Sequence, residues 1–352
     1  MTSTTPANVR VLVRIRPQNR RERAKQSTKH SILSVHGDSI QLNAAVAGSE
    51  DFGTISDKAK LFRFDAVLGP RTTQPEVFER TKSIVEACVN GYNGTILAYG
   101  QTGSGKTYTA FGNPGEEQSS CSAGLVQRSI RELFQGLSRK SAEDALNSYI
   151  SDEDDNIFNA IDNDPRTTLE KTASKYKLRH TTSVVHASFF EIFNEKIHDL
   201  LANDEMDLGR SLNVRENATT KTVYVDGLSE SVVANSEEAE RVIARGLKNR
   251  TVASTKMNHA SSRSHALLVL RIKTTTVTPA GITKVQQSKF TLVDLAGSER
   301  QKLTETEGAR LKEASMINKS LSCLGQVINS LVDLEAGKER HVPYRDSKVR
   351  RF

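Results

Sequence analysis

The sequence contains few cysteines and no long apolar segment, and each absence excludes a class of protein. Its three cysteines, Cys88, Cys121 and Cys323, lie far apart, and no two of them form a CxxC pair. An odd number of scattered cysteines supports neither a disulfide framework nor a zinc site, so we expect a reducing compartment. Residues 1–16 hold no uninterrupted apolar core of signal-peptide length, and no segment approaches the roughly 20 apolar residues that span a bilayer.

The composition is that of a globular protein with a basic balance. The chain has 352 residues, of which 36% are hydrophobic and 26% charged, enough for one large domain or two ordinary ones. Its formal net charge is +7. A basic balance favours a polyanionic partner, and charge alone does not distinguish a nucleic acid, an anionic membrane and an acidic protein surface.

Strand patterns and helix patterns alternate along the chain. The expected strands cover residues 8–16, 95–99, 183–190, 266–273 and 290–294. The clearest helix covers residues 306–331, where apolar residues recur every three or four positions, and residues 125–137 also have a helical pattern. This alternation predicts an α/β fold with a largely parallel central sheet flanked by helices.

Residues 138–180 break this rhythm. The segment is polar and contains the acidic run 151–155 between an expected helix and an expected strand. A loop of that length inside a compact domain is usually functional or disordered. We predict a mostly disordered surface insertion, with a small added subdomain as the alternative.

A glycine-rich loop follows the strand expected at residues 95–99. It matches the phosphate-binding pattern GxxxxGK[ST] at Gly100, Gln101, Thr102, Gly103, Ser104, Gly105, Lys106 and Thr107. The glycines let backbone N–H groups turn towards phosphate oxygens. Lys106 brings a positive charge to the β- and γ-phosphates, and the Thr107 hydroxyl is suited to Mg²⁺. A strand before the loop and a helix after it argue against a chance glycine-rich turn.

An acidic residue, Asp294, ends the strand expected at residues 290–294. At the carboxyl edge of a sheet its carboxylate is placed to bind Mg²⁺, through water. A strand-end aspartate is more often a helix cap, but here the sequence LAGSE (residues 295–299) follows. Within it, Gly297 has the freedom to swing its amide onto a γ-phosphate.

A third polar segment precedes the strand expected at residues 266–273. It reads NHASSRSH over residues 258–265 and contains three serines, an arginine and two histidines. An ordinary surface loop is one interpretation. The alternative is a phosphate-sensing loop, which needs hydroxyls for Mg²⁺ and water and a fixed cation to pair with an acid.

In their order and spacing, these three segments resemble the motor domain of the kinesin superfamily. GQTGSGKT is similar to its P-loop, residues 258–265 to its switch I, and DLAGSE (residues 294–299) to its switch II. Arg14, Arg16 and Pro17 resemble the adenine-side RxRP motif, and Tyr108 falls where an aromatic ring stacks on the base.

Further segments extend the resemblance over most of the chain. FFEIFNE (residues 189–195) and HVPYRDSK (residues 341–348) resemble two more signatures, the second in the microtubule-binding region. Residues 246–258 and 296–333 are most similar to kinesin-12-type mitotic motors.

The resemblance implies an ATP hydrolase with the P-loop NTPase-type fold of kinesin motors. Lys106 and Thr107 then hold the phosphates and Mg²⁺, and Ser262 completes the Mg²⁺ shell when switch I closes. It also implies that Ser261 helps to position the attacking water and that Gly297 senses the γ-phosphate.

By the same resemblance, Arg263 and Glu299 form a salt bridge between the two switches. Glu299 relays a proton through a second water. Both residues are therefore expected to act in the chemical step.

The resemblance further implies that the partner is the microtubule, with neither nucleic acid nor membrane bound, in the cytoplasm and on the cytoskeleton, including the spindle. The helix expected from residue 306 then faces the microtubule. The cations in and beside it are Lys302, Arg310, Lys312, Lys338, Arg340, Arg345 and Lys348. Each alone is typical of a solvated surface, but as a cluster facing an acidic polymer they account for the net charge.

The chain departs from the family pattern at two places. Ala110 stands where the family usually has Met, which we expect to change packing only. After Lys348 the family continues with Leu, Thr and an apolar helix, whereas this sequence reads VRRF over residues 349–352. We therefore expect residues 1–352 to be a motor domain that lacks its last strand, final helix and neck linker, and any stalk through which the full-length protein forms oligomers.

Two other interpretations stay open. A P-loop GTPase or transport ATPase shares the phosphate loop, but a GTPase normally carries an NKxD guanine reader, and NKSL (residues 318–321) lacks the aspartate. A truncated kinesin-like protein that binds microtubules without productive turnover is the second.

Overall fold

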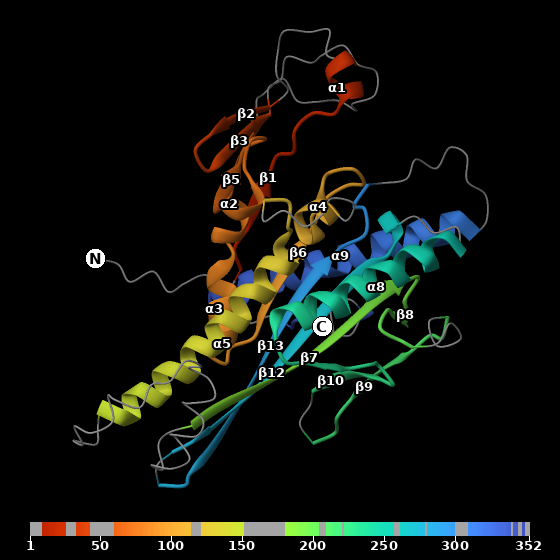
Figure 1. Cartoon of the computed structure of the whole chain (residues 1–352). Coiled ribbons are helices and arrows are strands. Elements are labelled where there is room, and N and C mark those ends of the chain that lie inside the picture. Colours follow the sequence, from red (N-terminus) through yellow and green to blue (C-terminus); the bar gives the residue numbers. More distant parts are fainter. Residues whose placement is uncertain are drawn as a thin grey trace. The chain divides into compact units, whose positions relative to one another are not determined.

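The structure is a computed structural model. It describes residues 9–25, 33–42, 60–113, 121–150, 180–203, 209–219, 222–256, 261–278, 280–299, 309–338, 341–343 and 347–348. The chain divides into two units of dense internal contacts; Figure 1 labels helices and strands of both. The larger unit consists of Phe78–Leu324 and Tyr344–Phe352, and the smaller unit consists of Met1–Val77 and Gly325–Pro343.

Three long strands form the centre of the larger unit. In chain order its sheet contains β6 (Gly94–Ala98), β7 (His180–Phe193), β8 (Lys196–Asp199), β11 (Ser231–Val233), β12 (His265–Val277) and β13 (Thr283–Asp294). The spatial order is β11-β7-β12-β13-β6, and β8 pairs with β7. β-Branched and aromatic residues, which favour a pleated and half-buried surface, are frequent in β7 and β12. The strands predicted in this part of the chain are confirmed, and β7, β12 and β13 are longer than predicted.

The strands of this sheet run in both directions. β6 and β13 are parallel, whereas β7, β12 and β13 pair antiparallel along their lengths. β12 and β13 form a hairpin closed by a hydrogen bond from the Thr278 amide to the Ile282 carbonyl (2.9 Å), and so short a connection requires antiparallel strands. The α/β class is confirmed, but the described sheet is mixed rather than largely parallel. The alternation of strand and helix patterns did not reveal which strands are joined by a hairpin.

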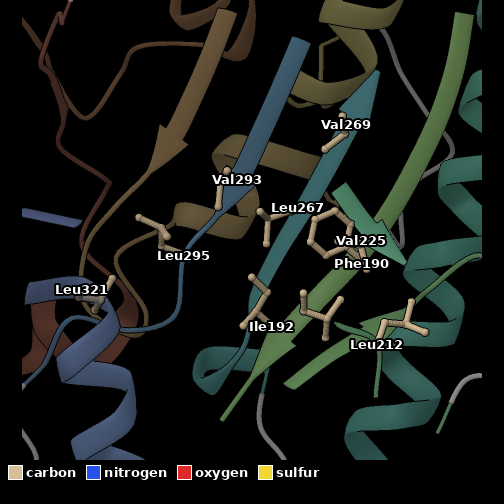
Figure 2. Packing of buried hydrophobic residues seen from close by; sticks show 10 residues of the cluster. Phe190, Ile192, Leu212, Val225, Leu267, Val269, Val293, Leu295 and Leu321 are labelled. Carbon is tan, nitrogen blue, oxygen red and sulfur yellow. The ribbon is translucent and has the colours of Figure 1, made fainter. Parts of the chain in front are cut away.

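β7 is buried on both faces of the sheet. Successive side chains of a strand point to opposite faces, and Phe189 and Phe190 are 0% and 1% exposed. Phe190 belongs to an apolar cluster with Leu267 and Leu295 (Figure 2). On the other face, the Phe189 ring lies 5.9 Å from the ring of Phe111. An apolar run such as FFEIF therefore marks a strand covered on both sides.

Helices cover both faces of this sheet. They are α3 (Lys82–Val89), α4 (Lys106–Phe111), α5 (Leu125–Ile150), α8 (Ser236–Lys256) and the first part of α9 (Ala309–Glu335). α5 contacts α3, α4, α8 and β7, on the side of Phe111. Leu321 of α9 belongs instead to the Phe190 cluster, on the opposite side (Figure 2).

Helix α5 is longer than the sequence predicts. It continues to Ile150, past residue 138, where we expected an insertion to begin. Polar contacts hold this part of the helix, because the Ser141 hydroxyl donates to the Thr181 carbonyl (2.8 Å) and the Thr181 hydroxyl donates to Asp144 (2.7 Å). Its polar sequence therefore forms a helix against β7 and not a loop. Residues 151–179, the rest of the expected insertion, lie outside the described residues.

A tight turn joins β7 to β8 and contacts a distant segment. Asn194 and Glu195 both have positive φ (48° and 57°), a conformation that non-glycine residues rarely adopt but that suits a two-residue hairpin. The Glu195 carboxylate accepts hydrogen bonds from the Ser347 hydroxyl and the Lys348 amide, each at 3.1 Å. The turn therefore holds residues 347–348 against the sheet.

A small antiparallel pair, β9 (Asn213–Glu216) and β10 (Val223–Asp226), completes the larger unit. Leu212 and Val225 pack from this pair into the Phe190 cluster (Figure 2). Among all the described residues, no helix is both long and apolar enough to cross a membrane.

The smaller unit contains two small sheets. β1 (Leu12–Arg14) pairs parallel with β5 (Ala66–Leu68). β2 (Leu33–His36), β3 (Ser39–Leu42) and β4 (Lys60–Arg63) pair antiparallel. Its helices are α1 (Arg20–Lys25), the start of α2 (Gln74–Glu79) and the last part of α9. The strand predicted over residues 8–16 is thus present in shorter form.

Two helical glycines differ in the space around them, and this difference predicts opposite effects of one substitution. A Cβ on Gly246 of α8 would lie 2.3 Å from Cδ1 of the buried Phe189, whereas no atom of the described residues lies within 4 Å of a Cβ on Gly325 of α9. We expect Gly246→Ala to lower the free energy of unfolding by about 1–3 kcal/mol through overpacking. Gly325→Ala should raise it by roughly 0.5–1 kcal/mol through helix propensity. Chemical denaturation measures both, and shifts in the same direction would contradict this prediction.

Candidate functional site

Three segments meet at one edge of the larger unit's sheet. β6 and β13 are parallel and end together, with Ala98 opposite Asp294, so the loops that follow them start side by side. The amides of Leu295 and Ser298 donate to the carbonyls of Ala98 (3.2 Å) and Gly100 (3.1 Å). β12 runs antiparallel to β13, so its first residues, at the end of switch I, reach the same edge. The sheet therefore brings together the three motifs that the sequence analysis singled out.

The P-loop bends sharply before α4. Gly103 (φ 76°) and Gly105 (φ 97°) adopt left-handed conformations that a side chain would strain. Between them, the Ser104 amide donates to the Gln101 carbonyl (3.1 Å). α4 begins directly after Gly105, at Lys106. The backbone therefore has the curvature that the phosphate-binding pattern predicts.

Lys106 lies inside the site and is not solvated on all sides. Its ammonium donates to the Gln101 carbonyl at 3.0 Å. Burial lowers the pKa of Lys106, and the negative charges of Asp294 and Glu299 oppose that shift. The lysine is therefore a cation held in place between the P-loop and switch II.

The Asp294 carboxylate is buried where the P-loop helix meets switch II, and it is 1% exposed. Its Oδ2 accepts hydrogen bonds from the Thr107 hydroxyl (2.8 Å) and the Arg250 guanidinium (3.2 Å). Its Oδ1 has no hydrogen-bond partner among the described residues. A buried carboxylate oxygen without a donor, beside a threonine hydroxyl, fits a hard divalent cation such as Mg²⁺, which prefers oxygen ligands.

Arg250 of α8 is a residue of this site that the sequence analysis missed. It is 5% exposed and, besides Asp294, approaches Glu191 of β7 at 3.8 Å. Its Nη2 donates to the Ser264 carbonyl at the end of switch I (3.4 Å). The guanidinium therefore links α8 to two strands and a switch. Its position four residues after Gly246 could have indicated this role, because residues four apart lie on the same face of a helix and Gly246 packs against Phe189 of the sheet.

Switch I and switch II are joined through their backbones. Ser262 lies in a 3-10 turn, η1 (Ser261–Arg263), and its carbonyl accepts a hydrogen bond from the Gly297 amide (2.7 Å). A Cβ on Gly297 would lie 2.3 Å from Oε2 of Glu299 and 2.4 Å from the Thr102 hydroxyl oxygen. Only glycine fits there without displacing both groups. The Ser261 side chain and residues 257–260 lie outside the described part of the chain.

Glu299 contacts the P-loop, not Arg263. Its carboxylate accepts hydrogen bonds from the Thr102 amide (2.9 Å) and the Thr102 hydroxyl (2.5 Å). Burial acts to raise the pKa of Glu299, but the hydrogen bonds from Thr102 and the charge of Lys106 outweigh it and hold the pKa below its usual value. The ion pair between Arg263 and Glu299 that the resemblance implies is not formed in this arrangement of the described residues.

His265, the first residue of β12, is a buried connection that the sequence analysis left without a role. Its Nδ1 accepts a hydrogen bond from the Ala296 amide (3.0 Å), and its Nε2 lies 2.9 Å from the Ser320 hydroxyl oxygen of α9. Burial, together with the positive charges of Arg250 and Lys106, lowers the pKa of His265 to about 4. The imidazole is therefore neutral at physiological pH.

Of the residues expected beside the adenine, three lie in the smaller unit and are held by their own neighbours. Arg14 donates to the side chain of Gln74 (2.8 Å), and Arg16 makes two hydrogen bonds to Glu22 (2.7 and 2.5 Å) and one to the Pro17 carbonyl (2.9 Å). These contacts fix the two arginines within their unit.

Tyr108, the residue expected to stack on the base, lies on α4 in the larger unit. Its side chain is 47% exposed. Half of its surface is therefore accessible from outside the larger unit.

The P-loop, with a buried strand-end aspartate beside it, places the chain in the class of P-loop nucleotide hydrolases. The particular family follows from comparison. The kinesin motor domain family matches residues 14–352, and the chain belongs to this family.

Relatives and a solved structure agree with this assignment. KIF15 of Rattus norvegicus is 41% identical over 355 residues, which cover 99% of this chain and 22% of that protein. KIF15 of Strongylocentrotus purpuratus is 44% identical over 293 residues, which cover 82% and 17%. KIF15 is a kinesin-12 member, as the sequence predicts. The chain spans about a fifth of the length of these curated relatives.

The fold is that of a known motor domain. A solved structure described as "Structure of a fast kinesin: Implications for ATPase mechanism and interactions with microtubules" matches with a TM-score of 0.70 and 34% identity. The match covers 97% of this chain and 80% of that chain. The predicted kinesin motor fold is therefore confirmed.

The neutral imidazole of His265 makes stability depend on pH. Its pKa is about 4 in the folded chain and about 6.5 in the unfolded chain. Its contribution is therefore complete above about pH 6.5 and is lost as the pH falls towards the folded pKa, by about 2 kcal/mol at pH 5.

The variant His265→Asn keeps an acceptor near Nδ1 but does not titrate. The difference in unfolding free energy between the wild type and His265→Asn should therefore shrink by about 2 kcal/mol between about pH 7.5 and pH 5. Urea denaturation at each pH measures this difference, and a constant difference would contradict a buried neutral imidazole.

Proposed function

We propose that this chain is the ATP-hydrolysing head of a longer kinesin-12-type protein that moves along microtubules. The observation that carries the proposal is the hydrogen bond between the Gly297 amide and the Ser262 carbonyl (2.7 Å). It joins switch I to switch II at the edge of the sheet where the P-loop begins. A phosphate that draws the Gly297 amide away from Ser262 changes both switches at once.

The larger unit supplies the groups that bind the phosphates. Lys106 exchanges its contact with the Gln101 carbonyl for the β- and γ-phosphates. Thr107, Ser262 and, through water, Asp294 would hold Mg²⁺, and the orphaned Oδ1 of Asp294 supports this assignment. Bound Mg²⁺ supplies neutralisation of phosphate charge and polarisation of the γ-phosphoryl group.

The switches supply the groups for hydrolysis. Ser261 positions the attacking water, and the Gly297 amide donates to the γ-phosphate. Because its pKa is held below the usual value, Glu299 is a carboxylate at neutral pH and can accept a proton through a second water. Glu299 exchanges Thr102 for Arg263 when the switches close.

We assign the adenine contact of the larger unit to Tyr108, which stacks on the base. The exposed half of its side chain supports this role. Arg14, Arg16 and Pro17 stay predictions that rest on the resemblance of their motif.

The microtubule-binding surface is proposed from the cations in and near α9. Arg310 and Lys312 lie on α9, and Lys338 forms an exposed ion pair with Asp333 (3.1 Å). Residues 347–348, which include Lys348, are held by the β7–β8 turn. The cations outside the described residues are Lys302, Arg340 and Arg345. Their charges suit the acidic surface of tubulin.

The setting follows from the same proposal. The protein acts on the microtubule cytoskeleton, with the spindle as one site of action. In the full-length protein, a stalk joins such heads into oligomers.

Steady-state turnover tests the proposed function. We expect the chain to hydrolyse ATP faster than GTP and to be stimulated by added microtubules. Equal turnover of GTP would favour the GTPase alternative. Microtubule binding without stimulated turnover would favour the non-motile alternative.

Removing the P-loop cation should abolish turnover. Lys106→Ala takes away a charge that stabilises phosphate in the ground state and in the transition state, so we expect kcat/KM for ATP to fall by about 10³-fold or more. The matched control is Lys284→Ala, which removes an exposed lysine near the other end of β13. Lys106→Ala turnover within about tenfold of the control would show that the P-loop assignment is wrong.

The two partners of Glu299 can be separated by substitution. Arg263→Ala and Glu299→Ala should each lower microtubule-stimulated kcat by about 100-fold while ATP still binds, because the ion pair forms only in the reactive state. Thr102→Val removes the hydroxyl that holds Glu299 in the present arrangement and should leave kcat within about tenfold. Normal stimulated rates in both alanine variants would refute the assigned roles.

A further inference from the structure

His265 forms a directed connection between switch II and α9, entirely within the larger unit. Its Nδ1 accepts the Ala296 amide (3.0 Å), so that nitrogen carries no proton. The proton of a neutral imidazole is then on Nε2, which donates to the Ser320 hydroxyl at 2.9 Å. The ring is a donor at one end and an acceptor at the other.

The alternation of side chains along the strands explains this position. His265 lies opposite Ile192 in the β7–β12 ladder and so shares its face of the sheet, where Leu295 and Leu321 also pack (Figure 2). Asp294, one residue before Leu295, points to the other face, towards Arg250 of α8. Neighbouring residues of switch II therefore contact different layers.

Two consecutive amides of switch II are held by switch I. The Gly297 amide donates to the Ser262 carbonyl (2.7 Å), and the Ala296 amide donates to His265 (3.0 Å). The Gly297 amide lies in one planar peptide unit with the Cα of Ala296, so a displacement of this amide also moves the Cα to which the Ala296 amide nitrogen is bonded. His265 and Ser320 are both 3% exposed, so water does not readily replace a bond that is lost there. When the Ala296 amide moves, the imidazole of His265 must move with it, or Nδ1 loses its buried hydrogen-bond donor.

We infer that His265 is a positioning residue that transmits a movement of switch II to α9 through the hydroxyl of Ser320. The inference rests on the proposed function, in which the γ-phosphate draws the Gly297 amide. His265 contacts neither the phosphates nor the attacking water in this role. It couples nucleotide binding to the helix on the opposite face of the sheet.

Hydrogen exchange in the full chain tests the connection without microtubules. Peptides from residues 309–324 are compared with and without Mg²⁺ and a non-hydrolysable ATP analogue. In the wild type we expect the analogue to change exchange rates in these peptides by about tenfold, the scale of one buried hydrogen bond. In Ser320→Ala the change should fall to about twofold or less.

A matched control exists on the same helix. Ser330 of α9 is also 3% exposed, and its hydroxyl donates to the Gln326 carbonyl one turn earlier (2.8 Å). Ser330→Ala therefore removes a buried hydroxyl of the same kind whose hydrogen bond stays within its own helix. It should respond to the analogue as the wild type does.

Two substitutions of His265 each remove one of its two hydrogen bonds and keep the other. His265→Asn keeps an acceptor near Nδ1 and loses the donor to Ser320, whereas His265→Gln keeps a donor near Nε2 and loses the acceptor for Ala296. Each should lower microtubule-stimulated kcat by about tenfold and leave KM for ATP within about twofold. The double variant His265→Asn/Ser320→Ala should be no worse than either single variant, because both remove the same connection.

The outcomes separate this inference from the proposed function. Loss of the analogue response in Ser320→Ala, with the response kept in Ser330→Ala, supports the inference. An unchanged response in Ser320→Ala, additive losses in the double variant, or no response in the wild type overturns it. If α9 of the wild type responds to the analogue but microtubules do not stimulate turnover, the proposed function fails while the connection stands.

Discussion

The parallel pairing of β6 with β13 is the constraint on which the site depends. Because the two strands end at one edge, the P-loop and switch II begin side by side, and the antiparallel β12 brings the end of switch I to the same place. The two-residue period of β13 then divides switch II between layers, with Asp294 facing α8 and Leu295 facing α9. A shift of one residue in this register would exchange the two faces and disconnect both.

A buried cation, Arg250, lies behind this edge. Arg250 lies between Asp294 (3.2 Å) and Glu191 (3.8 Å), where little water reaches any of the three groups. Such a cluster adds little net stability, because removing charges from water opposes their attraction. Its contribution is geometric: the guanidinium holds one oxygen of Asp294, while the other oxygen has no hydrogen-bond partner among the described residues. The same positive charge helps to keep the nearby imidazole of His265 neutral.

Local patterns predicted the parts of the site that depend on local chemistry. The P-loop is a contiguous motif, Asp294 ends an apolar strand, and Gly297 occupies a position with no room for a side chain. The partner of Glu299 could not be predicted, because Thr102 is 197 residues away along the chain. The connection from His265 to Ser320 depends on which face of β12 the imidazole takes. The extension of α5 to Ile150 could not be predicted either, because it depends on hydrogen bonds to the distant strand β7 and not on an apolar stripe in the sequence of the helix.

The turn at Asn194 and Glu195 has a consequence for the order in which the protein is made. Both residues hold positive φ angles, and the partners of the Glu195 carboxylate follow 152 and 153 residues later. Domains begin to fold during synthesis, from the N-terminus onward. On the ribosome this hairpin therefore emerges long before residues 347–348, and its contacts with them form only after Lys348 has left the exit tunnel. The attachment of residues 347–348 to the sheet is therefore one of the last contacts of the larger unit that can form during synthesis.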